Sequence, residues 1–262
     1  MRAIDVKNCD IFLKRKILDD VSFSINKFEH TAIIGPNGSG KSTIINMLTK
    51  SLYPSRFEGK KPVLKILEKE NWNLFELRKE MSLISNKFEE NLLNSCPLTV
   101  FDAVASSFLG TYGFFAGDKI TKIQNLETKK VLKDFDIYHI KNQQVSELST
   151  GQLKRVSIAR AMTLQPQIML LDEPSSGLDI SAQYELFKYI RSITSKLTLL
   201  MVTHHLEEII PEIEKIIMIK DGKIFKIGEK KKILTPENLS ELFDTKIALN
   251  IQNNNQYSMH RV

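Results

Sequence analysis

The sequence predicts an α/β protein built around a parallel β-sheet that is covered on both faces. Three short apolar segments carry this prediction: 31–34 (TAII), 167–172 (QIMLLD) and 197–203 (LTLLMVT). Their apolar runs are continuous rather than alternating, which is typical of strands buried on both faces. The segment 181–196 repeats apolar residues at helical spacing. Strand, helix and strand therefore follow one another as they do in a parallel sheet.

The other segments of this α/β arrangement are mainly helical. Residues 41–50 predict a helix, and the short apolar run 81–85 predicts another strand. Thr99 and Asp102 stand three residues apart, as in a capping box, and predict the start of a helix. From there to about Arg160 the pattern stays mainly helical.

The C-terminal part contains a hairpin pattern and a polar end. Segments 216–219 and 223–227 are joined by the Asp-Gly pair at 221–222. Because Asp-Gly favours a tight turn, we expect a β-hairpin here. Residues 252–262 (QNNNQYSMHRV) are polar, and we expect them to be poorly ordered.

Composition limits the classes of function. No apolar run approaches the roughly 18 residues that a membrane-spanning helix needs, and Cys9 and Cys96 fit no zinc or disulfide spacing. The net charge of +6 and the pI of about 9.1 indicate either an anionic partner or a lysine-rich solvated surface. The densest basic run, 226–232, has no interleaved aromatic residues. We therefore expect no specific nucleic-acid partner.

A phosphate-binding loop follows the first buried strand and matches the pattern G-x-x-x-x-G-K-[ST]. Its residues are Gly35, Pro36, Asn37, Gly38, Ser39, Gly40, Lys41, Ser42 and Thr43. Glycines let successive backbone N–H groups turn toward a polyphosphate, and the next helix presents its N-terminus to the same anion. Lys41 can neutralise the outer phosphates, and the Ser42 hydroxyl can bind Mg²⁺. A glycine-rich turn without function is the alternative, but the strand before it and the helix after it favour nucleotide binding.

Two carboxylates follow the strand at 167–172. Asp172 ends that strand, where it can hold the Mg²⁺ shell, and Glu173 can act as general base toward a water molecule. Adjacent acids after a strand can also be a solvated turn, and the phosphate loop is what favours the catalytic interpretation.

Residues 148–152 (LSTGQ) precede a predicted helix over 153–162. Small residues at a helix start leave backbone N–H groups open to an anion. The alternative is an ordinary helix cap made by Ser149. These residues alone do not decide between the two.

LSTGQ resembles the signature motif of the ABC (ATP-binding cassette) ATPases, whose usual form is LSGGQ. The phosphate loop lies upstream, and IMLLDEP, SGLD and MVTH lie downstream, in the order and spacing of that family. The resemblance covers about residues 3–243. It implies a P-loop NTPase (RecA-like) core with an N-terminal β portion and a helical subdomain. The segment 203–224 is also similar to the molybdate- and iron-type importer branch.

The resemblance implies one ABC ATPase domain over residues 1–262. Its nucleotide-binding core is expected over 1–86 and 157–232. The helical lobe that carries the signature motif is expected over 87–156, and a C-terminal tail over 233–262.

In the family, two such domains pack head to tail around two ATP molecules. By resemblance, Ser149, Gly151 and Gln152 bind the ATP that the partner chain holds, and Asp179 crosses the dimer interface. His204 resembles the switch histidine that contacts the γ-phosphate, where a neutral ring can bridge phosphate and base by hydrogen bonds. Its neighbour, at position 205, is not expected to do anything comparable.

Two further positions follow from the resemblance. Phe12 falls where the family has an aromatic ring that stacks on adenine, and the alternative is a strand residue that packs inward. Asn86 stands where the family has a glutamine that touches Mg²⁺. Asparagine is one methylene shorter, so its amide reaches about 1.3–1.5 Å less far. The metal ligands implied are thus Ser42, Asp172 and, if the loop compensates, Asn86.

The sequence therefore predicts an ATPase that uses ATP and Mg²⁺ to energise an ABC transporter. Its expected partners are a second copy of itself, or a homologous ATPase domain, and a membrane permease on another chain. It is expected to be cytoplasmic, on the inner face of the cell membrane. The alternatives are a soluble ABC ATPase in nucleic-acid, ribosome or metal-cluster processes, and a nucleotide-sensing regulator that scarcely hydrolyses ATP.

Overall fold

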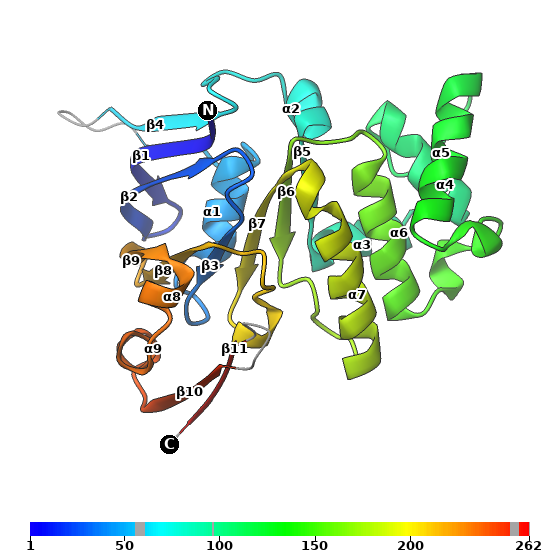
Figure 1. The fold of residues 1–262 in the computed structure, drawn as a ribbon. Helices are drawn as coiled ribbons and strands as arrows, with labels where there is room; N and C mark the ends of the chain where they lie inside the picture. Colours follow the sequence, from blue (N-terminus) through cyan, green and yellow to red (C-terminus); the bar gives the residue numbers. More distant parts are fainter. Residues whose placement is uncertain (56–60, 96, 252–256, 262) are drawn as a thin grey trace. The chain divides into compact units, whose positions relative to one another are not determined.

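The computed structural model describes residues 1–55, 61–95, 97–251 and 257–261 (Figure 1). The chain divides into two compact units. Unit 1 comprises Met1–Leu74, Leu170–Glu173 and Thr194–Val262. Unit 2 comprises Phe75–Met169 and Pro174–Ile193. By comparison, the helical lobe expected from the sequence spans 87–156.

Unit 1 contains most of the strands. They are β1 (Arg2–Phe12), β2 (Lys16–Asn26), β3 (Thr31–Ile34), β4 (Val63–Ile66), β7 (Thr198–Thr203), β8 (Lys215–Lys220), β9 (Lys223–Glu229), β10 (Ile247–Ile251) and β11 (Tyr257–Arg261). Strand β6 (Ile168–Asp172) enters this unit with its last residues. The helices are α1 (Lys41–Leu48), α8 (Lys230–Ile233), α9 (Pro236–Phe243) and the short 3₁₀ helices η4 (Thr194–Lys196) and η5 (Leu206–Glu208).

The main sheet of unit 1 runs in the order β6, β7, β3, β8, β9. Strand β3 lies between β7 and β8 and is parallel to both, with Ile33 opposite Val202 and Ile217. All residues of β3 and β7 are buried. The continuous apolar segments are therefore strands covered on both faces, as the sequence predicts.

The predicted hairpin forms between β8 and β9, which are antiparallel. Asp221 and Gly222 have φ angles of 48° and 76°, so both residues are left-handed, as a tight type I′ turn requires. A Cβ atom on Gly222 would lie 2.2 Å from the carbonyl oxygen of Ile17. Glycine is therefore needed both for the turn and for its close approach to β2.

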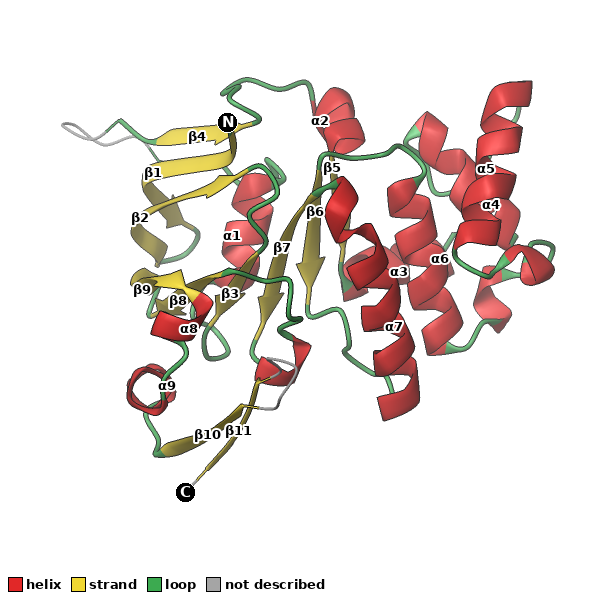
Figure 2. Ribbon diagram, in the orientation of Figure 1, coloured by secondary structure: helices red, strands yellow, loops and turns green. Residues whose placement is uncertain are grey.

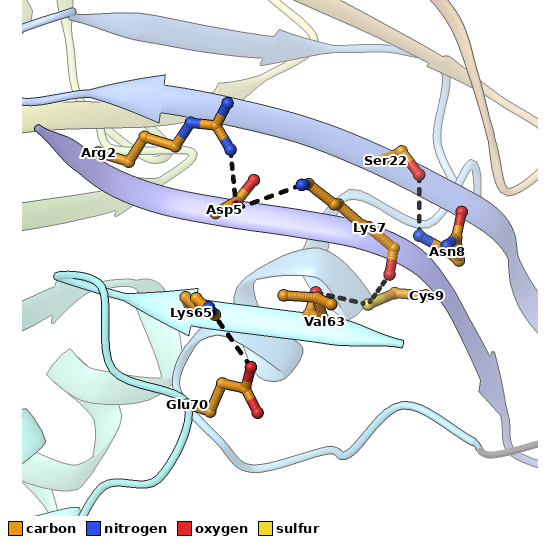
Figure 3. Close-up of polar contacts among 9 residues, drawn as sticks. All are labelled: Arg2, Asp5, Lys7, Asn8, Cys9, Ser22, Val63, Lys65 and Glu70. Carbon is orange, nitrogen blue, oxygen red and sulfur yellow. Dashed lines mark hydrogen bonds and ion pairs between the residues drawn. The ribbon is translucent and has the colours of Figure 1, made fainter. Parts of the chain in front are cut away.

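A second sheet, in the order β2, β1, β4, forms the N-terminal β portion. Figure 3 shows the polar contacts along it, where Asp5 binds Arg2 at 2.9 Å. The Cys9 thiol lies 3.4 Å from the carbonyl oxygens of both Lys7 and Val63. Burial raises the pKa of Cys9 to about 11, so this thiol stays protonated and serves the packing of the sheet. Cys96 lies outside the described residues.

Helix α1 begins directly after the phosphate loop and is the helix predicted over 41–50. It contacts β2 of the N-terminal sheet and β7 of the main sheet (Figure 1). Ile44, Ile45 and Leu48 are buried in these contacts. The helix whose N-terminus is predicted to face a nucleotide is thus fixed by apolar packing.

Unit 2 is mainly helical. Its helices are α2 (Leu74–Glu80, whose first residue belongs to unit 1), α3 (Asn86–Leu93), α4 (Val100–Ala105), α5 (Lys122–Asp134), α6 (Thr150–Met162) and α7 (Ile180–Ile193). The 3₁₀ helices are η1 (Ser106–Leu109), η2 (Tyr138–Ile140) and η3 (Val145–Glu147), and the strand is β5 (Met81–Ile84).

Helix α6 is the central element of unit 2. It contacts α3, α4, α5, α7 and β5 (Figure 2). Near its end, the buried Arg160 guanidinium donates hydrogen bonds to the carbonyls of Ala103 and Thr111 and to the Ser106 hydroxyl. The first residues of α6, which carry the signature motif, therefore extend from a helix that is held by its neighbours.

The C-terminal end corrects one expectation. Residues 257–261 were expected to be poorly ordered, but they form β11, which pairs with β10 in an antiparallel hairpin. Tyr257 is only 2% exposed, and the buried Lys230 ammonium lies 5.7 Å from its ring centre. One buried aromatic ring fixes a segment whose composition is otherwise polar. Residues 252–256 and 262 lie outside the described residues.

Candidate nucleotide-binding and hydrolysis site

The phosphate loop joins β3 to α1 and holds a buried cation. The Lys41 ammonium donates to the carbonyl oxygens of Gly35 at 2.8 Å and of Pro36 at 2.9 Å. Burial lowers the pKa of Lys41, and the nearby Glu173 and Asp172 carboxylates partly offset that effect. The loop therefore holds one positive charge at a fixed place.

Glycine is required at two places in the loop. A Cβ atom on Gly35 would lie 2.2 Å from the carbonyl oxygen of Ile219. Gly40 has a φ of 109°, and its Cβ atom would lie 2.7 Å from Leu18. Strands β2 and β8 thus press against the loop so closely that a side chain at either position would change its shape.

The loop fits an anion. Within the part of the chain that the structure describes, no side chain caps the N-terminus of α1, so its first N–H groups are available to a ligand. The Ser39 hydroxyl is buried and has no hydrogen-bond partner among the described residues. Unsatisfied donors at a helix start, together with a lysine ammonium, are what the phosphates of a nucleotide need.

Ser42 and Asp172 come together from α1 and β6. The Ser42 hydroxyl hydrogen-bonds the Asp172 carboxylate, which partly offsets a pKa raised by burial and by the charge of Glu173. A hydroxyl and a carboxylate are oxygen ligands of the kind that Mg²⁺ shares with phosphates and water. These two predicted metal ligands therefore fit the ion.

Glu173 and His204 form a close pair at the ends of β6 and β7. The His204 Nδ1 atom lies 2.8 Å from Glu173 Oε1. Glu173 has a left-handed φ of 50° and donates its N–H to the carbonyl of Val202 at 2.9 Å. The backbone is thus bent where the carboxylate is placed, a form of strain that is common at active sites.

The contact fixes which nitrogen of His204 donates. An ionised Glu173 only accepts, so Nδ1 must carry the proton. A neutral ring then leaves Nε2 as an acceptor, and it cannot also donate to a phosphate. With Glu173 ionised, the expected bridge between base and phosphate therefore requires a ring that carries a proton on both nitrogens.

His205 was expected to have no comparable role, yet its ring centre lies 3.9 Å from that of His204. Its backbone N–H also donates to the Thr203 hydroxyl at 2.9 Å. His205 therefore packs against His204. The adjacent HH pair was the only sequence signal for this contact.

Phe12 lies at the end of β1 and is 43% exposed. The Lys16 ammonium lies 5.7 Å from its ring centre. The alternative that Phe12 packs inward is therefore wrong, and the exposed ring is compatible with stacking on a base.

The signature residues begin α6 with a capping box. The Ser149 hydroxyl accepts the N–H of Gln152 at 3.3 Å, and Gln152 Oε1 accepts the N–H of Ser149 at 2.9 Å. A Cβ atom on Gly151 would make only an ordinary contact of 3.4 Å with Ala182. The helix-cap interpretation is thus confirmed, and nucleotide binding by these residues stays a prediction.

Asp179 caps a helix as well. Its Oδ1 atom accepts the N–H of Ala182 at 2.8 Å, and its carbonyl accepts the N–H of Gln183 at 2.9 Å, which begins α7. Its expected role across a dimer interface stays a prediction.

Asn86 is the first residue of α3, after the Ser85 cap. Its side-chain oxygen accepts a hydrogen bond from Lys154 at 3.3 Å, and Lys154 also binds Glu89 at 3.0 Å. Neither Lys154 nor Glu89 was singled out in the sequence, because the pair is 65 positions apart and both residue types are usually solvated.

Comparison with known proteins settles the family. The family pattern described as ABC transporter matches residues 18–176. The chain belongs to the ABC transporter ATP-binding proteins. Relatives include the energy-coupling factor transporter ATP-binding protein EcfA of Pediococcus pentosaceus, 34% identical over 91% of this chain and 83% of that protein. The zinc import ATP-binding protein ZnuC of Acinetobacter baylyi is 30% identical over 78% of this chain and 68% of that protein.

Solved structures agree on the fold. CbiO1 from Clostridium perfringens, part of the ABC transporter complex CbiONQ, matches with a TM-score of 0.75. The match covers 92% of this chain and 93% of CbiO1 at 23% identity. The P-loop α/β fold of ABC ATPases, as predicted from the sequence, is thereby confirmed.

This ABC protein is an ATPase that energises a transporter. Different residues of the site are expected to bind phosphate and to accept the proton from water. We predict that Lys41 and the loop N–H groups bind the phosphates, where they would also neutralise charge that develops on the transferred group. Glu173 is placed to accept a proton from water, and His204 holds the Glu173 carboxylate in one orientation.

We expect the Lys41→Met variant to bind ATP about 10- to 150-fold more weakly, since a hydrogen bond to a charged group contributes roughly 1.5–3 kcal/mol. A fluorescent ATP analogue measures the change. Lys50→Met is the matched control, because the Lys50 ammonium is also buried and also donates to backbone carbonyls, those of Leu64 and Glu70. Equal affinities for the two variants would contradict the role of Lys41.

Proposed function

We propose that two copies of this ABC ATPase close head to tail on ATP and thereby drive a membrane permease carried on another chain. The observation that carries the proposal is the start of α6. Ser149 and Gln152 cap each other there, and Gly151 adds no side chain over the helix N-terminus. This second N-terminus, distinct from that of α1, is a place for a phosphate that another chain's loop holds.

Mg²⁺ completes the proposed chemistry. When bound, it neutralises the β- and γ-phosphate oxygens. Ser42 and Asp172 are the residues that would hold it, since their oxygens already meet and burial and the Glu173 charge raise the pKa of Asp172, so that a cation there would stabilise its ionised form. Hydrolysis of ATP to ADP and phosphate then removes the anion that joins the two copies.

A mixing experiment tests the head-to-tail site. Lys41→Met removes the phosphate loop's cation, and Gly151→Asp places a carboxylate at the start of α6, where it repels phosphate. Each variant alone is expected to be inactive. Random pairing gives about half mixed dimers, each with one of its two sites intact, so the mixture should recover about a quarter of wild-type turnover.

The two possible outcomes are distinct. Recovery on mixing requires that the loop and the signature residues of one site come from different chains. If each variant is inactive and the mixture stays inactive, although both variants dimerise, the site lies within one chain and the head-to-tail arrangement is wrong.

Unit 2 has features that support docking on a permease. Phe115, Ile123 and Leu126 are exposed apolar residues of this unit, and such side chains are typical of protein interfaces. Among the residues described, no helix is both long and apolar enough to cross a membrane. We place the protein on the cytoplasmic face of the membrane, held there by the permease.

The name of one relative, the zinc import ATP-binding protein ZnuC, supports a role in uptake, as does the resemblance of 203–224 to the molybdate- and iron-type importers. The neighbouring genes provide a direct check, because a multi-spanning permease beside this gene would identify the partner. A neighbour that acts on nucleic acid or ribosomes would favour the soluble alternative.

A further inference from the structure

A buried polar cluster in unit 2 joins the start of α3 to the start of α6. Its members are Asn86, Glu89 and Lys154. Lys154 is 1% exposed and Glu89 is 6% exposed. The Lys154 ammonium lies 3.0 Å from Glu89 Oε2 and 3.3 Å from Asn86 Oδ1.

The chemistry of the ammonium decides which atom of the Asn86 amide it meets. A lysine ammonium has three donors and no acceptor. The amide atom that faces it must therefore be the oxygen, not the nitrogen. The oxygen is also the only atom of an asparagine side chain that can bind Mg²⁺.

A metal ion on the same oxygen would lie beside a fixed positive charge. Mg²⁺ binds oxygen at about 2.1 Å, so the ion and the ammonium would be at most about 5.4 Å apart, the sum of that length and the 3.3 Å contact. At that distance in a buried place the two cations repel strongly. The Asn86 oxygen, as it is placed here, does not fit a metal ligand.

Lys154 cannot easily move away. Burial raises the pKa of Glu89, and the charge of Lys154 and its hydrogen bond offset only part of that rise. Glu89 Oε1 has no hydrogen-bond partner among the described residues. If Lys154 left, the Glu89 carboxylate would be buried with no counter-charge.

The length of the asparagine side chain matches this arrangement. A glutamine in the same direction would carry its oxygen about 1.3–1.5 Å further. The separation from the ammonium would then fall to about 2 Å, which is shorter than any normal hydrogen bond. Asparagine therefore fits beside the buried lysine, whereas a glutamine in the same direction would not.

We propose that Asn86 does not bind Mg²⁺ but is one end of a tether, Asn86–Lys154–Glu89, that fixes the start of the signature helix to the start of α3. Lys154 is its positioning residue, one turn beyond Gly151 on α6. The inference rests on the nucleotide site and the signature role proposed above. Movement of the signature residues and movement of the Asn86 segment are then linked mechanically, without a shared metal ion.

Binding of ADP with Mg²⁺ and with a chelator tests the metal part. The affinity for ADP with Mg²⁺, divided by the affinity for ADP with the chelator, measures how much the ion adds to binding. We expect Asn86→Ala to keep this ratio within about threefold of wild type, which is under ~0.7 kcal/mol. Asp172→Asn, which removes a metal carboxylate, is expected to lower the ratio at least about tenfold.

Hydrogen exchange of residues 149–155 tests the tether part. Asn86→Ala should make these amides exchange faster, because one anchor of α6 is lost. The double variant Lys154→Gln/Glu89→Gln removes both charges and keeps hydrogen-bonding groups. It leaves no unpaired buried charge that could unfold the chain. Its residues 149–155 should exchange as fast as those of Asn86→Ala, and its ADP affinity ratio with and without Mg²⁺ should equal that of wild type.

A tenfold fall of the ratio in Asn86→Ala would make Asn86 a metal ligand and overturn the proposal. So would unchanged exchange over 149–155 in both variants. These measurements compare the variants with the wild-type chain and use ADP, so they do not depend on dimer closure or on a permease. If the head-to-tail proposal fails, the exchange result still decides whether the tether exists.

Discussion

The Glu173→Gln variant is expected to bind ATP as wild type does and to hydrolyse it about 10²- to 10⁴-fold more slowly, the usual contribution of a general base. The carboxylate is fixed at the end of β6 by the bond from its own N–H to Val202. Its Oε1 atom is held by His204 at 2.8 Å. Glutamine preserves the size of the side chain and its hydrogen bond, but it cannot accept a proton from water.

Single-turnover hydrolysis and a binding titration separate the two effects. With ATP and Mg²⁺ the variant should also accumulate a dimer in size-exclusion chromatography that ADP does not support. Glu207→Gln is the matched control, because Glu207 lies in η5, three residues after His204, and is exposed. If Glu173→Gln keeps normal turnover and forms no dimer, Glu173 is not the general base and the two copies do not close head to tail on ATP.

The buried strands and the phosphate loop beside Glu173 were predictable from the sequence because their causes are local. The strands β3 and β7 are fully buried, so their sequences are continuous apolar runs. The phosphate loop needs glycine at positions 35 and 40 because backbone and side chains press against it, and those glycines are what the pattern records. The glycines of the phosphate-loop pattern therefore record the lack of space for a side chain at these two positions.

Other parts of the site depend on contacts between distant segments. Lys154 and Asn86 are 68 positions apart, and nothing in either local sequence indicates that the lysine is buried. The left-handed φ of Glu173 is likewise invisible, because it results from the bond to β7. The C-terminal hairpin was missed because composition averages over the segment and does not weigh the one buried ring of Tyr257.

The resemblance to ABC ATPases supplied predictions that local patterns could not, namely those for His204 and the signature motif. It also assigned Asn86 to the metal by position alone. The structure shows what that position contacts in this chain, an ammonium. A family role can therefore be transferred only where the surroundings of the side chain also match.

Removal of the tether's cation is expected to have the second large effect. The Lys154→Met variant should lower the free energy of unfolding by about 3–5 kcal/mol, the usual result when one partner of a buried ion pair is removed. Glu89 is then left buried, and its second oxygen already has no hydrogen-bond partner within the described part of the chain. Urea unfolding followed by circular dichroism measures the change.

Two controls show that the unpaired charge is the cause. Lys188→Met removes an exposed lysine of α7 that pairs with Glu185 at 3.8 Å, and it should change stability by less than about 1 kcal/mol. The double variant Lys154→Met/Glu89→Leu removes both charges, and it should recover most of the loss because apolar residues often replace a buried ion pair without penalty. If the double variant is no more stable than Lys154→Met, the loss comes from packing of the lysine stem, and the ion pair does not hold α3 to α6.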